Sequence, residues 1–189
     1  MLTTELKNQF RYKLRFKKRP LKKLIDLPPP VTTDFPPEPQ KTVNNIKKSQ
    51  QDAKSYRGII LPNGLKATLI SDPTAQKSAA CMSIEVGHMS DPPEIPGLAH
   101  LCEHTLLLGS EKFPTDNDFR LFLSENGGYA NAQTFADVTK YFFDILPEKF
   151  EEAIERFAKM FIAPLFNVDA VMREISAVNS EHEKNLASD

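Results

Sequence analysis

The stretch PGLAHLCEHTLLL (residues 96–108) decides the fold, because it is predicted to be the helix against which the other elements pack. Its leucines are good helix formers, Pro96 is tolerated in a first helical turn, and Gly109 follows where a left-handed residue would end the helix. Apolar residues occur on all sides of the segment, so we expect this helix to be largely buried.

His100, Glu103 and His104 stand at positions i, i+3 and i+4 of the predicted helix, so their side chains share one face. Burying two imidazoles and a carboxylate is costly unless a partner satisfies them, and a metal ion does so well. The spacing is HxxEH, the inverse of the HExxH zinc-protease motif. It predicts a zinc site, with two unrelated core histidines beside a helical glutamate as the alternative.

The composition limits the class of protein. With 189 residues, of which 40% are hydrophobic and 26% charged, the chain can bury one core and is expected to form a single domain with a tail. Its two cysteines, Cys81 and Cys102, make no disulfide framework, which favours a reducing, cytoplasmic location. No apolar run has the length needed for a membrane span.

The first 50 residues differ in composition from the rest and are predicted to be a disordered tail and linker. Residues 1–24 carry nine Lys/Arg and one Glu, and residues 26–40 are rich in proline. The basic stretch is interpreted as a solvated tail, a mitochondrial targeting segment, or a contact for a membrane surface or an acidic partner. Because the remainder is acidic, a nucleic-acid role for the folded part is disfavoured.

Residue patterns beyond residue 50 predict an α+β fold, with a mixed, mostly antiparallel sheet packed against helices on one face. Two apolar-rich runs flank Pro62-Asn63-Gly64 and predict a β-hairpin. Apolar periodicity and turn residues place the remaining elements. The expected strands are 56–61, 65–70, 77–86, 129–135 and 140–146, and the expected further helices are 116–125, 148–161 and 169–184.

The last helix offers a third metal ligand. A catalytic zinc usually takes three protein ligands and a water, and the motif supplies two if Glu103 is kept as a base. Glu174 and Glu181 stand seven positions apart and project from one helical face. Glu181 is the first choice and Glu174 the second, while His182 and Glu183 would be turned away. On spacing alone, exposed glutamates in ion pairs are the alternative.

Four segments resemble the insulin-degrading enzyme (insulysin) branch of the pitrilysin-type inverzincin metallopeptidases: GLAHLCEH (97–104), FLSENGG (122–128), NAQT (131–134) and REISAVNSEHEKN (173–185). The resemblance extends from about residue 56 to the end of the chain. It implies that His100, His104 and Glu181 bind Zn²⁺, that Glu103 is the catalytic general base, and that Glu174 supports the site by holding a ligand.

The resemblance also implies a function, a zinc-dependent metalloendopeptidase that hydrolyses small to medium peptides. Zinc would lower the pKa of a water, Glu103 would take its proton, and an edge strand containing Asn131 and Ala132 would pair with the peptide substrate. Gln133 departs from the aromatic residue that usually follows in these enzymes.

Enzymes of this family have four homologous domains, so residues 51–189 would be an incomplete catalytic domain. Its expected partner is the missing C-terminal half of the same or a homologous chain. Two alternatives remain at this point. One is a truncated, non-catalytic homologue or peptide-binding partner that retains the zinc site, and the other is an organellar processing or presequence-degrading peptidase.

Overall fold

The computed structural model of the chain describes residues 39–185, which divide into two compact units, 39–75 and 76–185. The basic stretch 1–24 and most of the proline-rich stretch lie outside the described residues, so their predicted roles as tail and linker stay predictions. Among residues 39–185, no helix has the length and apolar character that crossing a membrane requires.

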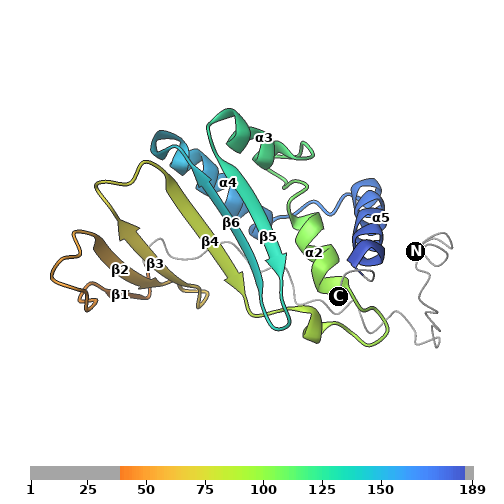
Figure 1. The fold of residues 1–189 in the computed structure, drawn as a ribbon, viewed down its shortest axis with the longest axis horizontal. Coiled ribbons are helices and arrows are strands. Elements are labelled where there is room, and N and C mark those ends of the chain that lie inside the picture. The colour runs from red at the N-terminus through yellow and green to blue at the C-terminus, as the bar shows by residue number, and fades with distance from the viewer. Residues whose placement is uncertain (1–38, 186–189) are drawn as a thin grey trace. The chain divides into compact units, whose positions relative to one another are not determined.

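The smaller unit is a three-stranded antiparallel sheet in the order β1-β2-β3 (Figure 1). Gly64, with φ of 85°, closes the turn between the second and third strands, and the predicted hairpin is confirmed. The first strand falls inside the stretch predicted as a linker, where it pairs with the second strand. The three strands are β1 (Lys41–Val43), β2 (Ser55–Ile60) and β3 (Lys66–Ser71).

The larger unit contains a second antiparallel sheet, in the order β4-β6-β5, and four described α-helices. The predicted α+β class is confirmed, although the described strands form two sheets with no parallel pair. The elements are β4 (Ser78–Ile84), η2 (His88–Ser90), α2 (Leu98–Leu106), α3 (Asp118–Glu125), β5 (Tyr129–Thr134), β6 (Thr139–Ile145), η3 (Pro147–Lys149), α4 (Phe150–Ile162) and α5 (Val168–Asn185).

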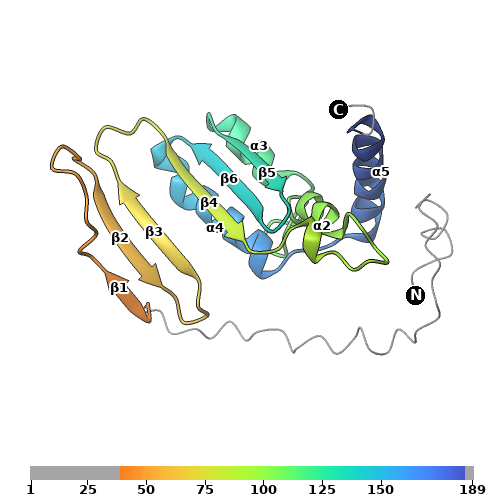
Figure 2. The same cartoon turned by 60° about the horizontal axis from the view of Figure 1, so that its bottom comes forward.

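One face of the second sheet carries the core. Alternate residues of β6 are buried, as expected for a strand with one apolar face, and Phe143 lies at their centre. Its ring contacts Phe119 of α3 and Phe157 of α4, with centroids 5.4 and 5.1 Å apart. Both helices therefore cover the same face of the sheet (Figures 1 and 2). This is the predicted arrangement of helices on one side.

Helix α2 lies beside β5, and α5 packs against the outer side of α2 (Figure 2). The bounds of α2 differ from the prediction at both ends. The helix begins after Gly97, whose φ of 91° sets the entry of the chain, so Pro96 precedes the helix instead of occupying its first turn. It ends at Leu106, and Gly109 has a φ of 158° and not the left-handed value expected.

The N-terminus of α2 is capped by a residue that is distant along the chain. Asp91 accepts hydrogen bonds from the backbone N–H groups of Gly97 (2.6 Å) and Ala99 (2.8 Å). These groups have no partner within the helix, and a negative charge near them is favourable because helix dipoles are positive at this end. The carboxylate of Asp91 therefore fixes the start of the helix that carries the HxxEH motif.

We expect Asp91→Ala to lower the free energy of unfolding by about 1–2 kcal/mol, the range found for loss of a helix cap. Asp91→Asn should lose less, because its amide oxygen can still accept one of the two hydrogen bonds. The measurement is urea unfolding. Asp137→Ala, which changes an exposed aspartate with no hydrogen bond described for it, serves as the control. Equal stabilities for Asp91→Ala and the control would contradict the capping role.

Gly87 brings the chain close to the turn between β5 and β6. The N–H groups of His88 and Met89 donate to the carbonyl oxygens of Phe135 (3.0 Å) and Ala136 (2.8 Å). A Cβ atom at Gly87 would lie only 2.3 Å from the Phe135 oxygen, so glycine is required here for steric reasons. This contact holds the loop that precedes α2 against the end of β5.

Candidate metal centre

The two histidines of the motif lie side by side on α2. The Nε2 atoms of His100 and His104 are 3.2 Å apart, and the ring planes cross at 79°. Both rings are partly exposed, as the i, i+4 spacing on an accessible helical face allows. The predicted convergence of the two imidazoles is therefore present in the structure.

The third member comes from α5, 77 positions after His104. Glu181 Oε2 lies 3.4 Å from His100 Nε2 and 3.5 Å from His104 Nε2. In the part of the chain that the structure describes, these three residues are the group whose ligand atoms could hold a metal ion together. The structure thus brings together the residues that the resemblance implied as ligands, while His182 and Glu183 do not join them.

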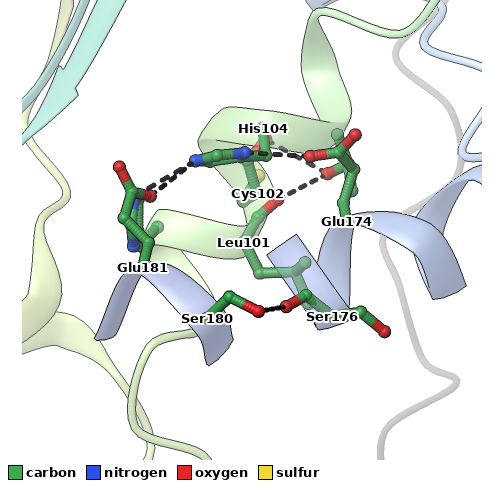
Figure 3. Close-up of polar contacts among 9 residues, drawn as sticks. Leu101, Cys102, His104, Glu174, Ser176, Ser180 and Glu181 are labelled. Atoms are coloured by element: carbon green, nitrogen blue, oxygen red, sulfur yellow. Dashed lines mark hydrogen bonds and ion pairs between the residues drawn. The ribbon is translucent and has the colours of Figure 1, made fainter. Parts of the chain in front are cut away.

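Glu174 contacts His104 on the side of its ring opposite Glu181. Its Oε2 atom lies 2.9 Å from His104 Nδ1, so the ring of His104 is held between Glu174 and Glu181 (Figure 3). An ionised carboxylate can only accept a hydrogen bond, so Nδ1 is assigned as the donor and Nε2 carries the lone pair. The hydrogen bond from Nδ1 to Glu174 therefore leaves the lone pair of Nε2 facing His100 and Glu181, where it could bind a metal ion.

The spacing of the three atoms fits a small divalent cation. Tetrahedral ligands about 2.0–2.2 Å from a zinc-sized ion lie roughly 3.3–3.5 Å from one another. The measured separations are 3.2, 3.4 and 3.5 Å. Three electron-rich atoms at such distances repel unless a proton or a cation lies among them. Two imidazole nitrogens with one carboxylate oxygen are also a suitable donor set for such an ion.

Glu103 is the most buried of the three acidic residues near this centre, with 7% of its surface exposed. Its Oε2 atom accepts a 2.5 Å hydrogen bond from the hydroxyl of Thr134 on β5. Beneath the helix, burial raises the pKa of Tyr141, and nearby Cys102 and Glu103 raise it further. Tyr141 therefore stays protonated and adds no charge below Glu103.

A cavity of about 680 Å³ opens over these residues and extends along β5. Asn131 and Ala132 line it, so the structure places the predicted peptide-contacting residues beside the candidate metal centre. Its lining holds three glutamates and one arginine, Arg120, and this balance favours a cation. In the described sheet β5 pairs only with β6, and its outer edge is left without a strand partner.

Sequence reasoning missed two residues that shape the site, Asp91 and Thr134. The segment NAQT (131–134) is part of the family resemblance, but the resemblance implies a role only for Asn131 and Ala132. The expectation that the motif helix is largely buried is wrong for Leu98 and Cys102, which are exposed.

The fold and site define an α+β domain with a candidate two-histidine, one-glutamate metal centre, and comparisons with known proteins place it in a family. Residues 66–189 match the family model of insulinase, peptidase family M16. The chain therefore belongs to peptidase family M16.

Individual relatives are similar over most of the chain but are much longer. The insulin-degrading enzyme of Drosophila melanogaster is 57% identical over 152 residues, which cover 80% of this chain and 15% of that protein. The Mus musculus enzyme is 46% identical over 171 residues, covering 90% and 17%. The crystal structure of pitrilysin matches with a TM-score of 0.72 and 34% identity, covering 75% of this chain and 15% of that one.

Proposed function

We propose that this chain carries the zinc-binding catalytic site of a metalloendopeptidase that hydrolyses small to medium peptides. The observation that carries the proposal is the triangle of ligand atoms from His100, His104 and Glu181, at 3.2–3.5 Å, beside the buried carboxylate of Glu103. Membership of a peptidase family supports the reaction class, and relatives named insulin-degrading enzymes support a peptide substrate.

Zinc, when held by the three ligand side chains, would supply a Lewis acid that polarises a peptide carbonyl and lowers the pKa of a water. His100 and His104 contribute Nε2 atoms, and Glu181 contributes a carboxylate oxygen. Glu174 accepts the Nδ1 proton of His104 and so fixes the ring in the tautomer that binds a metal. The N, N, O donor set is compatible with zinc, and the HxxEH spacing of the two histidines is the reason for naming it.

Glu103 moves the proton in this mechanism. Its carboxylate accepts a proton from the attacking water and passes it to the nitrogen of the departing amine, acting first as a base and then as an acid. Glu103 directly precedes His104 in the sequence and lines the same cavity as His100, His104 and Glu181. A water bound among these three ligands would therefore lie within reach of the Glu103 carboxylate. Burial keeps the bulk solvent from competing for that proton.

The peptide would lie in the cavity along the outer edge of β5. An extended segment can add to an unpaired strand through backbone hydrogen bonds, which select for shape more than for sequence. Asn131 and Ala132 occupy this edge beside the metal centre. We infer further that the remaining part of the same or a homologous chain closes over the peptide, since the chain spans 15% of the length of its fruit-fly relative.

The test combines metal content with cleavage. We expect the full chain to bind one equivalent of zinc by elemental analysis and to cleave an internally quenched peptide. A chelator should abolish cleavage, and added zinc should restore it. Cleavage that survives complete removal of metal would refute the proposal. Stoichiometric zinc without any cleavage would instead favour a zinc-binding homologue that has lost turnover.

A further inference from the structure

Thr134, at the end of β5, makes a contact with the motif glutamate that the proposed mechanism has not yet used. Its hydroxyl donates to Glu103 Oε2 at 2.5 Å, the short end of the range for hydrogen bonds to a carboxylate. In the part of the chain that the structure describes, no other side chain hydrogen-bonds to this carboxylate. Thr134 therefore determines how the buried Glu103 carboxylate is held.

The alternation of β5 explains why Thr134 reaches the helix. Ala130 and Ala132 are buried on the face of the strand that meets the core, and Thr134 is two positions further on the same face. Asn131 and Gln133 point to the opposite face. The small alanines allow α2 to lie close to β5, so that a side chain as short as threonine reaches Glu103.

A second threonine limits the choices open to this hydroxyl. Thr139, directly opposite Thr134 in the β5–β6 pair, is 4% exposed and donates to the carbonyl oxygen of Val86 at 2.7 Å. The two threonine oxygens are 3.5 Å apart, much farther than the 2.5 Å between Thr134 and Glu103, and the one hydroxyl proton of Thr139 is already used by Val86. The proton of Thr134 is thus left for Glu103, and rigid strand backbone fixes the donor.

We propose that Thr134 is a positioning residue for the general base. By holding Oε2, it leaves Oε1 to exchange the proton with water and with the departing amine. A carboxylate without this hydrogen bond could rotate about its terminal torsion, which has a broad energy profile. Misplacement of a reacting group by about 1 Å can cost roughly 100-fold in rate. This inference rests on the proposed role of Glu103.

The test compares two substitutions in the full chain. Thr134→Val keeps the branched shape and removes the hydroxyl, and we expect kcat for a quenched peptide to fall about 10- to 100-fold. KM and zinc content should not change, because no ligand is altered and valine keeps the shape of the cavity lining at this position. Thr134→Ser restores the hydroxyl and should recover kcat to within about threefold of wild type.

A matched control removes a similar hydrogen bond elsewhere. Thr74 donates to Asp72 at 2.7 Å on the exposed surface of the smaller unit, and Thr74→Val should leave kcat unchanged. A structural readout accompanies the kinetics. In a crystal structure of metal-free Thr134→Val, the Glu103 carboxylate should occupy more than one rotamer. A single, unchanged rotamer together with unchanged kcat would overturn the positioning role.

A double mutant separates positioning from general damage. If Thr134 acts through Glu103, then adding Thr134→Val to Glu103→Gln should cause no further loss of kcat, because the base is already absent. A further 10-fold loss would show that Thr134 acts by another route and would overturn the inference alone. A wild-type chain that cleaves no peptide would overturn the proposed function, and the positioning role of Thr134 with it.

Discussion

Glu103→Gln is expected to lower kcat for peptide hydrolysis by about 100- to 10,000-fold, the usual contribution of a positioned acid–base group. The substitution keeps the shape of the side chain, and the amide oxygen can still accept the hydrogen bond from Thr134. The amide cannot take a proton from water at neutral pH. Zinc content should equal that of wild type, because the three ligand atoms are untouched. Initial rates with a quenched peptide, alongside elemental analysis, make the measurement.

The control for this prediction is Glu125→Gln, which changes an exposed glutamate at the end of α3. It should leave both kcat and zinc content at the wild-type values. If Glu103→Gln cleaves as fast as wild type, Glu103 is not the base. If it loses zinc, then Glu103 belongs among the ligands and the division of roles between Glu103 and Glu181 is wrong.

Glu181→Ala is expected to lower zinc affinity by more than about 100-fold, beyond the range that loss of a ligand's hydrogen-bond partner causes. Glu181 Oε2 lies within 3.5 Å of both histidine Nε2 atoms, so its removal leaves two protein ligands. Glu174→Ala should have the smaller effect, about 10- to 100-fold, because Glu174 contacts Nδ1 of His104 and only orients the ring. Competition titration with a chromophoric chelator measures both.

Glu183→Gln gives the matched control on the same helix. Glu183 is exposed, its Oε1 atom accepts a hydrogen bond from Asn179 Nδ2 (3.3 Å), and it is not among the three candidate ligands, so its replacement should not change zinc affinity. A larger loss from Glu174→Ala than from Glu181→Ala would reverse the assigned roles of these two glutamates. Loss of affinity in the control would show that α5 as a whole, and not one carboxylate, decides binding.

The local part of the site could be predicted from the sequence because helical periodicity is short in range. The i, i+3, i+4 spacing places His100, Glu103 and His104 on one face, and a separation of seven places Glu174 and Glu181 on one face of α5. The spacing could not rank the two glutamates. Their order depends on how α5 lies against α2, so the choice of Glu181 before Glu174 had no geometric basis until the resemblance supported it.

Contacts set by tertiary packing could not be predicted in this way. Asp91 caps α2 from six to eight positions upstream, across an intervening loop, so it lacks the pattern of a residue placed directly before a helix. Thr134 reaches Glu103 only because β5 presents its core face to α2. In contrast, Asn167 accepts from the N–H groups of Asp169 and Ala170, the local pattern of an asparagine placed directly before a helix.

The division of the strands illustrates a similar limit. Each predicted strand is present to within about two residues at each end, since alternation and turn residues mark strands well. Pairing depends on partners far apart in the chain. β4 pairs with β6, more than fifty positions later, while β3 pairs with the adjacent β2. The sequence pattern locates strands but does not identify their partners, so it predicts one sheet where the described residues form two.

The loop that Asp91 closes onto α2 contains Pro92, Pro93 and Pro96. Each proline restricts the conformations of the unfolded chain, so less entropy is lost when this loop takes its native shape. The N–H groups of Gly97 and Ala99 at the start of α2 thus meet their acceptor through a segment that is stiff before folding. Glycine at these three positions would leave every native contact of Asp91 possible and still make the start of α2 harder to form.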